Sequence, residues 1–248
     1  MFISIILPTY NEENNIIPII KEIENVLKSF NYEIIIIDDN SLDNTFHKIT
    51  DLSKINKSIF PISRIDEKGL ASAIKHGIKK CKGDIVIWFD CDFSHPTYIL
   101  PEFIKRIQNE KLDAVIASRF IVGSKDLTFK LFTIIHFHKI LSKWLNKLCS
   151  KLLINSFTDW TSGFIAIKSD ILKKIEFNGN HGEYFMELVF GLGINGYRVR
   201  EIPFESPPRK TGDSKTANNI KSLILNGYYY FHKLFQLLIR KIKTNKIT

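Results

Sequence analysis

Two carboxylates one residue apart are the sharpest chemical feature of the chain. Asp90 and Asp92 flank Cys91, at the end of the apolar run 84–89. Side chains two positions apart on an extended segment point to the same side. Their oxygens are the hard ligands that Mg²⁺ and Mn²⁺ prefer, and these ions accept substrate phosphates alongside protein ligands. A solvated turn after a strand carries the same residue types, so the pair alone predicts either a metal site or a polar turn.

Polar residues also follow three other apolar runs. Pro8–Glu12 follows the first run, Asp38–Ser41 follows the second, and Arg119 comes directly after the run that ends at Ser118. Each segment has a structural explanation when taken alone. Pro8 ends a strand and Asn11 would cap the next helix, and the acids of the second segment would form a turn or cap.

The segments that must position these groups alternate between strand and helix patterns. Strands are predicted at 2–7, 33–37, 58–63, 84–89 and 113–118, and helices at 12–29, 44–52, 69–81 and 96–108. Continuous apolar strands between amphipathic helices predict an α/β fold, a mostly parallel sheet with helices on both faces. Ligands of such sheets bind beyond the carboxyl ends of the strands. The acids and Arg119 would therefore gather at one edge of the sheet.

The second half of the chain is less regular. The patterns predict a long amphipathic helix at 129–154, strands at 164–167 and 197–202, a helix near 183–192 and a C-terminal helix from about 220 to 243. No Pro/Gly/Ser-rich linker divides the chain. We predict one domain over 1–216 and a basic, amphipathic C-terminal helix within 217–248.

Composition narrows the classes of function. The 248 residues carry a formal net charge of +9, which favours anionic partners. Nucleic-acid binding is disfavoured, because acids cluster where the site should lie and the lysines form helix faces. Three cysteines without metal or disulfide spacing fit a reducing compartment. The N-terminus lacks the pattern of a signal peptide, and we expect no membrane span.

Together, the segments Pro8–Glu12, Ile37–Ser41 and Asp90–Asp92 resemble the strand-end motifs of family 2 of the glycosyltransferases, which have the GT-A fold. Within that family the chain looks most like the polyprenol-phosphate (dolichol-phosphate) mannosyltransferases and glucosyltransferases. Further supporting segments are Glu67–Leu70, Asp92–Pro96, Ala117–Arg119, Ser162–Phe164 and Gly212–Lys215. The resemblance covers roughly residues 1–216.

The resemblance implies a role for each matching position. The nucleotide sugar would be held by Pro8, Tyr10, Glu12, Asp38, Asp39, Lys68, Arg209 and Lys215. A Mg²⁺ or Mn²⁺ ion would be held by Asp90, Asp92 and Ser94, and the acceptor phosphate by Arg119, His138 and Ser142. The implied reaction is inverting transfer of a hexose from GDP-mannose or UDP-glucose to a polyprenyl or dolichyl phosphate. A UDP-N-acetylhexosamine is another candidate donor.

The chain departs from the family pattern at three positions. Ser94 stands where many relatives have glutamine, and His138 and Thr211 stand where arginine is frequent. Two alternatives follow. In the first, the acceptor is a sugar hydroxyl in cell-surface polysaccharide synthesis, and Asp159 is the general base that such an acceptor requires. In the second, the chain is a membrane-bound scaffold that has lost activity.

Two helices predict contact with a membrane surface. The helix at 129–154 carries an apolar side that includes Trp144 and Leu145, and lysines recur at 139, 143, 147 and 151. A core helix with a solvated lysine face is the alternative. The C-terminal helix joins an aromatic cluster at Tyr228–Phe231 to a basic tail, a combination typical of a peripheral anchor. We expect a peripheral location on the cytoplasmic face of a membrane, through surface adsorption or a membrane partner subunit.

Overall fold

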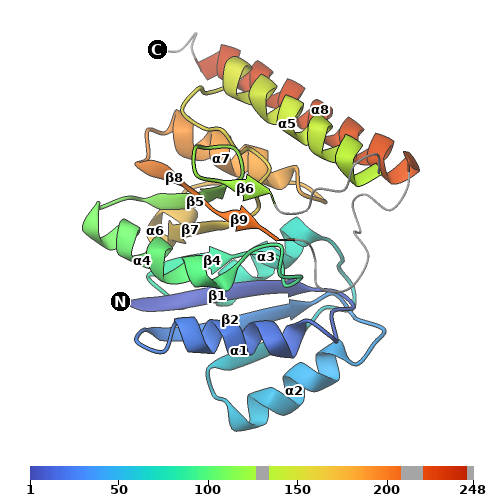
Figure 1. The fold of residues 1–248 in the computed structure, drawn as a ribbon, viewed down its shortest axis with the longest axis vertical. Coiled ribbons are helices and arrows are strands. Elements are labelled where there is room, and N and C mark those ends of the chain that lie inside the picture. Colours follow the sequence, from blue (N-terminus) through green and yellow to red (C-terminus); the bar gives the residue numbers. More distant parts are fainter. Residues whose placement is uncertain (127–133, 208–219, 245–248) are drawn as a thin grey trace.

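A computed structural model of the chain describes residues 1–126, 134–207 and 220–244. Its centre is a seven-stranded sheet in the order β3-β2-β1-β4-β7-β5-β8, beside a two-stranded sheet of β6 and β9. Helices cover both faces of the larger sheet (Figure 1). The predicted fold class, α/β with helices on both faces of a largely parallel sheet, is therefore confirmed.

The elements have the following bounds. The strands are β1 Phe2–Thr9, β2 Asn31–Asp38, β3 Ile59–Ser63, β4 Ile85–Trp88, β5 Ala114–Ser118, β6 Lys125–Asp126, β7 Ile165–Lys168, β8 Val199–Pro203 and β9 Glu205–Ser206. The helices are α1 Ile16–Val26, α2 Thr45–Ile55, α3 Leu70–Lys80, the 3₁₀ turn η1 Thr97–Ile99, α4 Leu100–Asn109, α5 Ile134–Leu152, α6 Ser169–Leu172, α7 Tyr184–Ile194 and α8 Ile220–Thr244.

One strand runs against the others. β7 is antiparallel to both β4 and β5, whereas the remaining pairs of the sheet are parallel. The segment before β7 is tied to the end of β5, because the Ser162 hydroxyl donates to the Ala117 carbonyl and Arg119 pairs with Asp159. The chain therefore enters β7 at the edge where β5 ends and must run back. The sequence pattern predicted this strand but not its direction.

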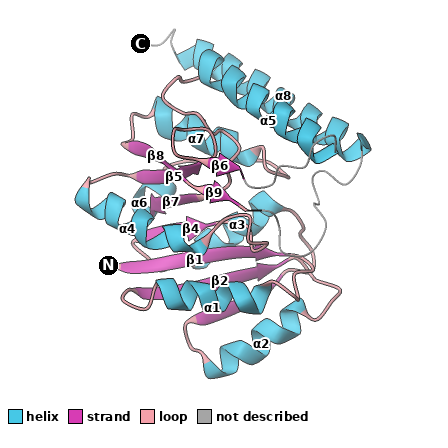
Figure 2. Cartoon of the chain, viewed as in Figure 1, coloured by secondary structure: helices cyan, strands magenta, loops and turns pink. Residues whose placement is uncertain are grey.

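The core consists of two apolar layers, one on each face of the sheet. Alternate strand residues, such as Ile5 and Ile6, enter opposite layers, as the period of two in a strand requires. One layer includes residues of α1, α2 and α4, and the other includes residues of α3 and α5–α8. The loops after β1 and β2 lie at the same end of the sheet (Figure 2).

The C-terminal helix packs against the domain. Leu234 and Leu237 of α8 are buried in the core, and Lys233 pairs with Glu187 of α7 at 2.7 Å. Lys241 donates to the Leu153 carbonyl just beyond α5 at 2.5 Å, and α8 lies beside α5 (Figure 1). The predicted C-terminal helix is thus present and is joined to the domain by buried contacts. The predicted domain boundary at 216/217 lies outside the described residues.

The predicted apolar side of α5 divides between core and surface. Leu145 and Cys149 are buried, whereas the Trp144 side chain on the same helix is 59% exposed. Lys143, Lys147 and Lys151 are exposed as well. None of the helices described is both long enough and apolar enough to cross a membrane.

Candidate active site

A cavity of about 520 Å³ opens at the carboxyl ends of β1, β2 and β4. These strands are neighbours in the sheet and parallel, so their terminal residues meet at one edge. The predicted site residues that line this donor cavity are Pro8, Tyr10, Glu12, Asp39, Lys68, Asp90 and Asp92. The Lys68 ammonium also lies 5.3 Å from the centre of the Tyr10 ring. The structure therefore brings together residues separated by more than 80 positions in the chain.

Asp38 and Asn11 hold the loops behind this cavity. Asp38 is buried and accepts hydrogen bonds from the Ser41 backbone N–H at 2.9 Å and the Ser41 hydroxyl at 2.5 Å. It forms the turn after β2 and does not line the donor cavity. Asn11 does not cap α1, contrary to that structural explanation, because Asn15 occupies the cap position. Instead the Asn11 side-chain oxygen Oδ1 accepts a hydrogen bond from the Leu42 backbone N–H at 2.8 Å and joins the two loops.

Arg64 fixes Asp39, and sequence reasoning missed it. Its Nε donates to Asp39 Oδ1 at 2.8 Å, and its other nitrogens donate to the Gly69 carbonyl at 3.1 Å and the Ser72 hydroxyl at 2.9 Å. Asp39 Oδ2 accepts from the Gly69 N–H at 2.8 Å. The guanidinium thus ties the end of β2 to the loop before α3, which forms part of the cavity wall. Its position directly after β3, at the same sheet edge, was the available signal.

Two of the candidate metal ligands, Asp92 and Ser94, are hydrogen-bonded to each other. Asp92 Oδ1 accepts from both the backbone N–H of Ser94, at 2.9 Å, and its hydroxyl, at 2.6 Å. Asp90 and Asp92 both line the donor cavity. Within the described residues, no group of three or more His, Cys, Asp or Glu side chains is arranged to hold a metal by itself. Two carboxylates and a hydroxyl nevertheless fit Mg²⁺ or Mn²⁺, which take part of their coordination from substrate phosphates.

His95 holds the backbone of Asp90. Its Nδ1 accepts a hydrogen bond from the Asp90 N–H at 3.1 Å, which requires that nitrogen to be unprotonated. Burial lowers the pKa of His95, against the opposing effect of Asp90 and Asp92. The ring packs against Phe164, with 5.0 Å between ring centres. This histidine, which the sequence placed only in a motif, therefore acts as a neutral support for the first carboxylate.

A second cavity, of about 280 Å³, adjoins the first. The two cavities share Leu70, Asp90 and Gly182 as lining residues. The predicted residues Ser94, Arg119 and Ser142 line this acceptor cavity, so Ser94 lies on its wall beside Asp90. Helix α8 adds Gly227, Tyr230 and Phe231. The sequence assigned no site residue to α8, because its pattern predicted a surface helix.

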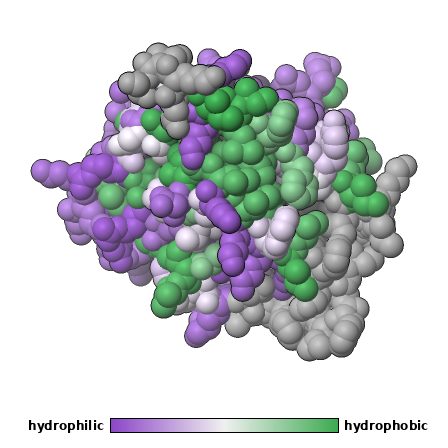
Figure 3. Space-filling model, turned by 90° about the horizontal axis from the view of Figure 1, so that it is seen from above, coloured by the Kyte–Doolittle hydropathy of each residue, from purple (hydrophilic) through white to green (hydrophobic). Residues whose placement is uncertain are grey.

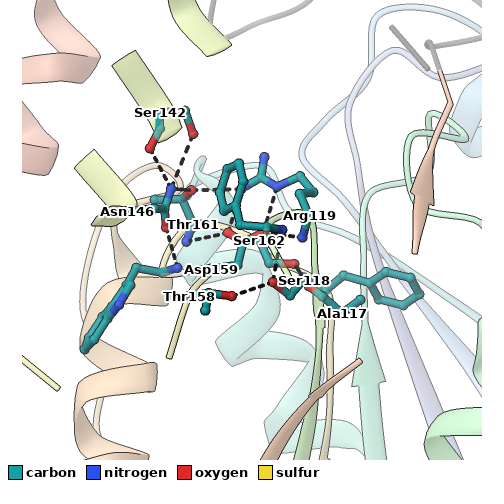
Figure 4. A network of polar contacts seen from close by, with 12 residues as sticks. Ala117, Ser118, Arg119, Ser142, Asn146, Thr158, Asp159, Thr161 and Ser162 are labelled. Carbon is teal, nitrogen blue, oxygen red and sulfur yellow. Dashed lines mark hydrogen bonds and ion pairs between the residues drawn. The ribbon is translucent and has the colours of Figure 1, made fainter. Parts of the chain in front are cut away.

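The Arg119 guanidinium donates hydrogen bonds to the buried carboxylate of Asp159 (Figure 4). Asp159 accepts from Arg119 Nε at 2.8 Å, from Arg119 Nη2 at 2.7 Å and from the Arg119 backbone N–H at 2.9 Å. The Asp159 side chain is 0% exposed and lines neither cavity. Its geometry suits orienting Arg119, and it does not suit taking a proton from an acceptor hydroxyl.

The remaining predicted residues cannot be placed. Arg209, Lys215 and the departure at Thr211 lie outside the described residues. His138 belongs to α5, but its side chain is outside the described part of the chain.

Comparison with known proteins agrees with this arrangement of strands and acids. The model of the family described as "Glycosyl transferase family 2" matches residues 4–176, which is more than half of the chain. The chain belongs to glycosyl transferase family 2. The resemblance inferred from the strand-end motifs is thereby confirmed.

Relatives within family 2 include two dolichol-phosphate mannosyltransferases. That of Pyrococcus furiosus is 34% identical over 217 residues, which are 87% of this chain and 59% of the relative. That of Mycosarcoma maydis is 28% identical over 244 residues, 95% of this chain and 77% of the relative. The chain therefore spans well under two thirds of the Pyrococcus protein.

Solved structures show the same fold. Glucosyl-3-phosphoglycerate synthase from Mycobacterium tuberculosis, in complex with Mn²⁺, UDP and glucosyl-3-phosphoglycerate, superposes with a TM-score of 0.71 at 17% identity, covering 96% of this chain and 80% of that one. This likeness supports the GT-A fold of the family 2 member described here.

Proposed function

We propose that this family 2 member transfers a hexose, mannose or glucose, from a nucleotide sugar to the phosphate of a polyprenyl or dolichyl lipid, with inversion at the anomeric carbon. The observation that carries the proposal is the pair of adjoining cavities. One holds the acids and the other holds Arg119, and both reach Asp90. The names of the two relatives, both dolichol-phosphate mannosyltransferases, support transfer of mannose and a dolichol-phosphate acceptor.

The donor cavity suits the nucleotide diphosphate. Tyr10, Asp39 and Lys68 would bind the nucleotide end, and Asp90, Asp92 and Ser94 would hold a divalent cation beside the diphosphate. When bound, Mg²⁺ or Mn²⁺ would supply charge neutralisation to the departing nucleoside diphosphate. The Mycobacterium synthase of the same fold was solved with Mn²⁺ and UDP, which supports a divalent cofactor.

The acceptor cavity suits an anion that is already a nucleophile. A lipid phosphate needs positioning and charge balance but no general base. Arg119 supplies the charge, and Asp159 fixes its direction by the hydrogen bonds described above. A sugar hydroxyl would need a base, and the buried pairing of Asp159 with Arg119 argues against that role. Attack on the anomeric carbon from the side opposite the departing nucleoside diphosphate would invert the anomeric centre.

A peripheral location on an anionic membrane surface, on its cytoplasmic face, is part of the proposal. Exposed apolar residues gather on α8 and α5, and Figure 3, which views the molecule from their side, shows a hydrophobic area across this face with hydrophilic residues beside it. The exposed large apolar residues of the two helices are Ile140, Trp144, Leu152, Ile224, Leu225, Tyr228, Phe231, Phe235, Ile239 and Ile242. Phe231 also lines the acceptor cavity, so a lipid phosphate would reach Arg119 from the membrane side.

The decisive experiment offers the purified chain labelled GDP-mannose, UDP-glucose or UDP-N-acetylglucosamine, with and without polyprenyl phosphate and with Mg²⁺, Mn²⁺ or a chelator. We expect label in the organic phase only when lipid phosphate and metal are both present. Asp92→Ala should abolish this transfer, while Asp51→Ala, an exposed acid on α2, should not. Transfer that survives chelation, or label that enters only a soluble saccharide, would overturn the proposal.

The membrane surface has its own test. Sedimentation with vesicles of phosphatidylcholine, with or without phosphatidylglycerol, should show binding that needs the anionic lipid and weakens with salt. Phe235→Ser with Ile239→Ser should reduce binding, whereas Ile55→Ser, an exposed residue on α2, should leave it unchanged. Equal binding by both variants would show that α8 is not the contact surface.

A further inference from the structure

We infer that the Thr161 hydroxyl donates a hydrogen bond to the phosphate of the acceptor, and that Arg119 and Asn146 aim its proton into the acceptor cavity. The inference rests on the proposed function, because it concerns how a phosphate acceptor is held. Neither Thr161 nor Asn146 was among the residues predicted from the sequence. Thr161 is a binding residue in this arrangement, and Asn146 is a positioning residue.

Two donors point at the same oxygen (Figure 4). Thr161 Oγ1 accepts from Arg119 Nη2 at 2.8 Å and from Asn146 Nδ2 at 2.9 Å. A guanidinium has no acceptor, so the direction of the first bond is certain. The direction of the second follows from the other contacts of the Asn146 amide. Its oxygen accepts from the Trp160 backbone N–H, and its nitrogen also donates to the Ser142 carbonyl at 2.8 Å.

The hydroxyl therefore has no lone pair left and must direct its proton elsewhere. A hydroxyl oxygen has two acceptor positions and one O–H donor. The two bonds from Arg119 and Asn146 fill both acceptor positions. Within the part of the chain that the structure describes, no acceptor for the Thr161 proton is present among its hydrogen bonds.

The remaining direction faces the acceptor cavity. Thr161 lines that cavity together with Arg119, Ser142 and Ser94. Its oxygen accepts from a cationic guanidinium, and such hydrogen-bond chains polarise one another and strengthen the next donor. A phosphate oxygen, which only accepts, is the matching ligand. Arg119 and Thr161 would then present a charge and an oriented O–H to the same phosphate.

Three variants separate this role from a structural one. Thr161→Val removes the hydroxyl at nearly constant volume, and Thr161→Ser retains it. In Asn146→Asp the Thr161 oxygen still accepts from Arg119. The new carboxylate at position 146 would accept the Thr161 proton, which would then point away from the acceptor cavity. Thr158→Val is the matched control, because Thr158 bonds to Ser118 and Glu201 and lines neither cavity.

The measurement is steady-state transfer to polyprenyl phosphate in detergent, with nucleotide affinity and thermal unfolding recorded for each variant. Thr161→Val and Asn146→Asp should each raise the acceptor KM by about 10- to 100-fold, the effect of one hydrogen bond to a charged group, with nucleotide affinity unchanged. Thr161→Ser and Thr158→Val should stay within about 3-fold of wild type. Lowering the pH should bring the acceptor KM of Asn146→Asp back toward wild type, as the new carboxyl gains a proton and can donate again.

Other outcomes overturn the inference. An acceptor KM within about 3-fold of wild type for both Thr161→Val and folded Asn146→Asp would do so. Equal losses in Thr161→Ser and Thr161→Val would show that packing, not the proton, matters. If wild type transfers to polyprenyl phosphate and these variants keep the acceptor KM of wild type, only the inference fails. If wild type transfers nothing to it, the proposed function fails as well.

Discussion

Replacing Arg64 by leucine should destabilise the fold and weaken nucleotide binding far more than replacing Arg106. Both arginines bond to acidic side chains, so the pair isolates the effect of burial. The Arg64 side chain is 3% exposed and its partner Asp39 is 12% exposed. Arg106 is 37% exposed and pairs with Glu102 and Glu110 along one helix.

The expected magnitudes follow from these environments. Removing one member of a buried ion pair leaves the other charge uncompensated and costs about 3–5 kcal/mol. Asp39 keeps the hydrogen bond from the Gly69 N–H and some exposure, so we expect a loss near the lower bound, about 3 kcal/mol. Exposed helical pairs contribute below about 1 kcal/mol. A domain typically has about 5–15 kcal/mol of stability, so the Arg64 variant should still fold.

The assay is urea unfolding at neutral pH, followed by calorimetric titration with UDP and GDP. Arg64→Leu should lower the free energy of unfolding by about 3 kcal/mol. It should also raise the nucleotide Kd at least about tenfold, since Asp39 and Gly69 both line the donor cavity and lose their common support. Arg106→Leu should change the free energy of unfolding and the nucleotide Kd only slightly. Equal losses of stability in the two variants would refute the reasoning, as would an unchanged Kd in Arg64→Leu.

Three further predictions concern buried polar groups. Asp159→Asn should lower kcat/KM for the lipid phosphate about 100-fold by raising the acceptor KM, because Arg119 loses a charged partner. Loss of kcat with an unchanged acceptor KM would instead favour Asp159 as a general base. Burial lowers the pKa of His95, so as pH falls below about 6.5 the unfolded chain takes up a proton that the folded chain resists, and stability should fall. His95→Gln should flatten that slope in urea unfolding between pH 5.5 and about 7.5; an identical slope would contradict it. Burial raises the pKa of Cys149 to about 12, so a thiol reagent at neutral pH should leave it unmodified until urea is added, and rapid labelling of the folded chain would count against this burial.

Much of the fold was predictable because its signals are local. The run of isoleucines in 34–37 and the acids that follow it are visible within eight residues, and they became β2 and the turn formed by Asp38. The same locality explains a limit. Asp38 and Asp39 look alike in the sequence, yet one supports a turn and the other lines the donor cavity. Which of two neighbouring acids faces a ligand depends on the pleat of the strand and on Arg64 from the next one.

The long amphipathic helix shows a second limit. Its apolar spacing predicted α5, but it did not separate Leu145, which is buried, from Trp144, which is exposed. When the apolar face of a helix is wider than the surface that packs against it, some of its apolar residues stay exposed. The position of the neighbouring helix determines which residues these are. Here α8 is the helix that packs against α5.

The amino-acid sequence by itself determined the α/β class, the family and the carboxylates at the strand ends, because periodicity and strand-end motifs are properties of short segments. Only the tertiary structure decided that β7 runs backward, that α8 walls the acceptor cavity, and that Arg119, Asn146 and Thr161 meet at one oxygen. Those contacts join residues 15 to 42 positions apart. They depend on register and helix packing, which no local pattern specifies.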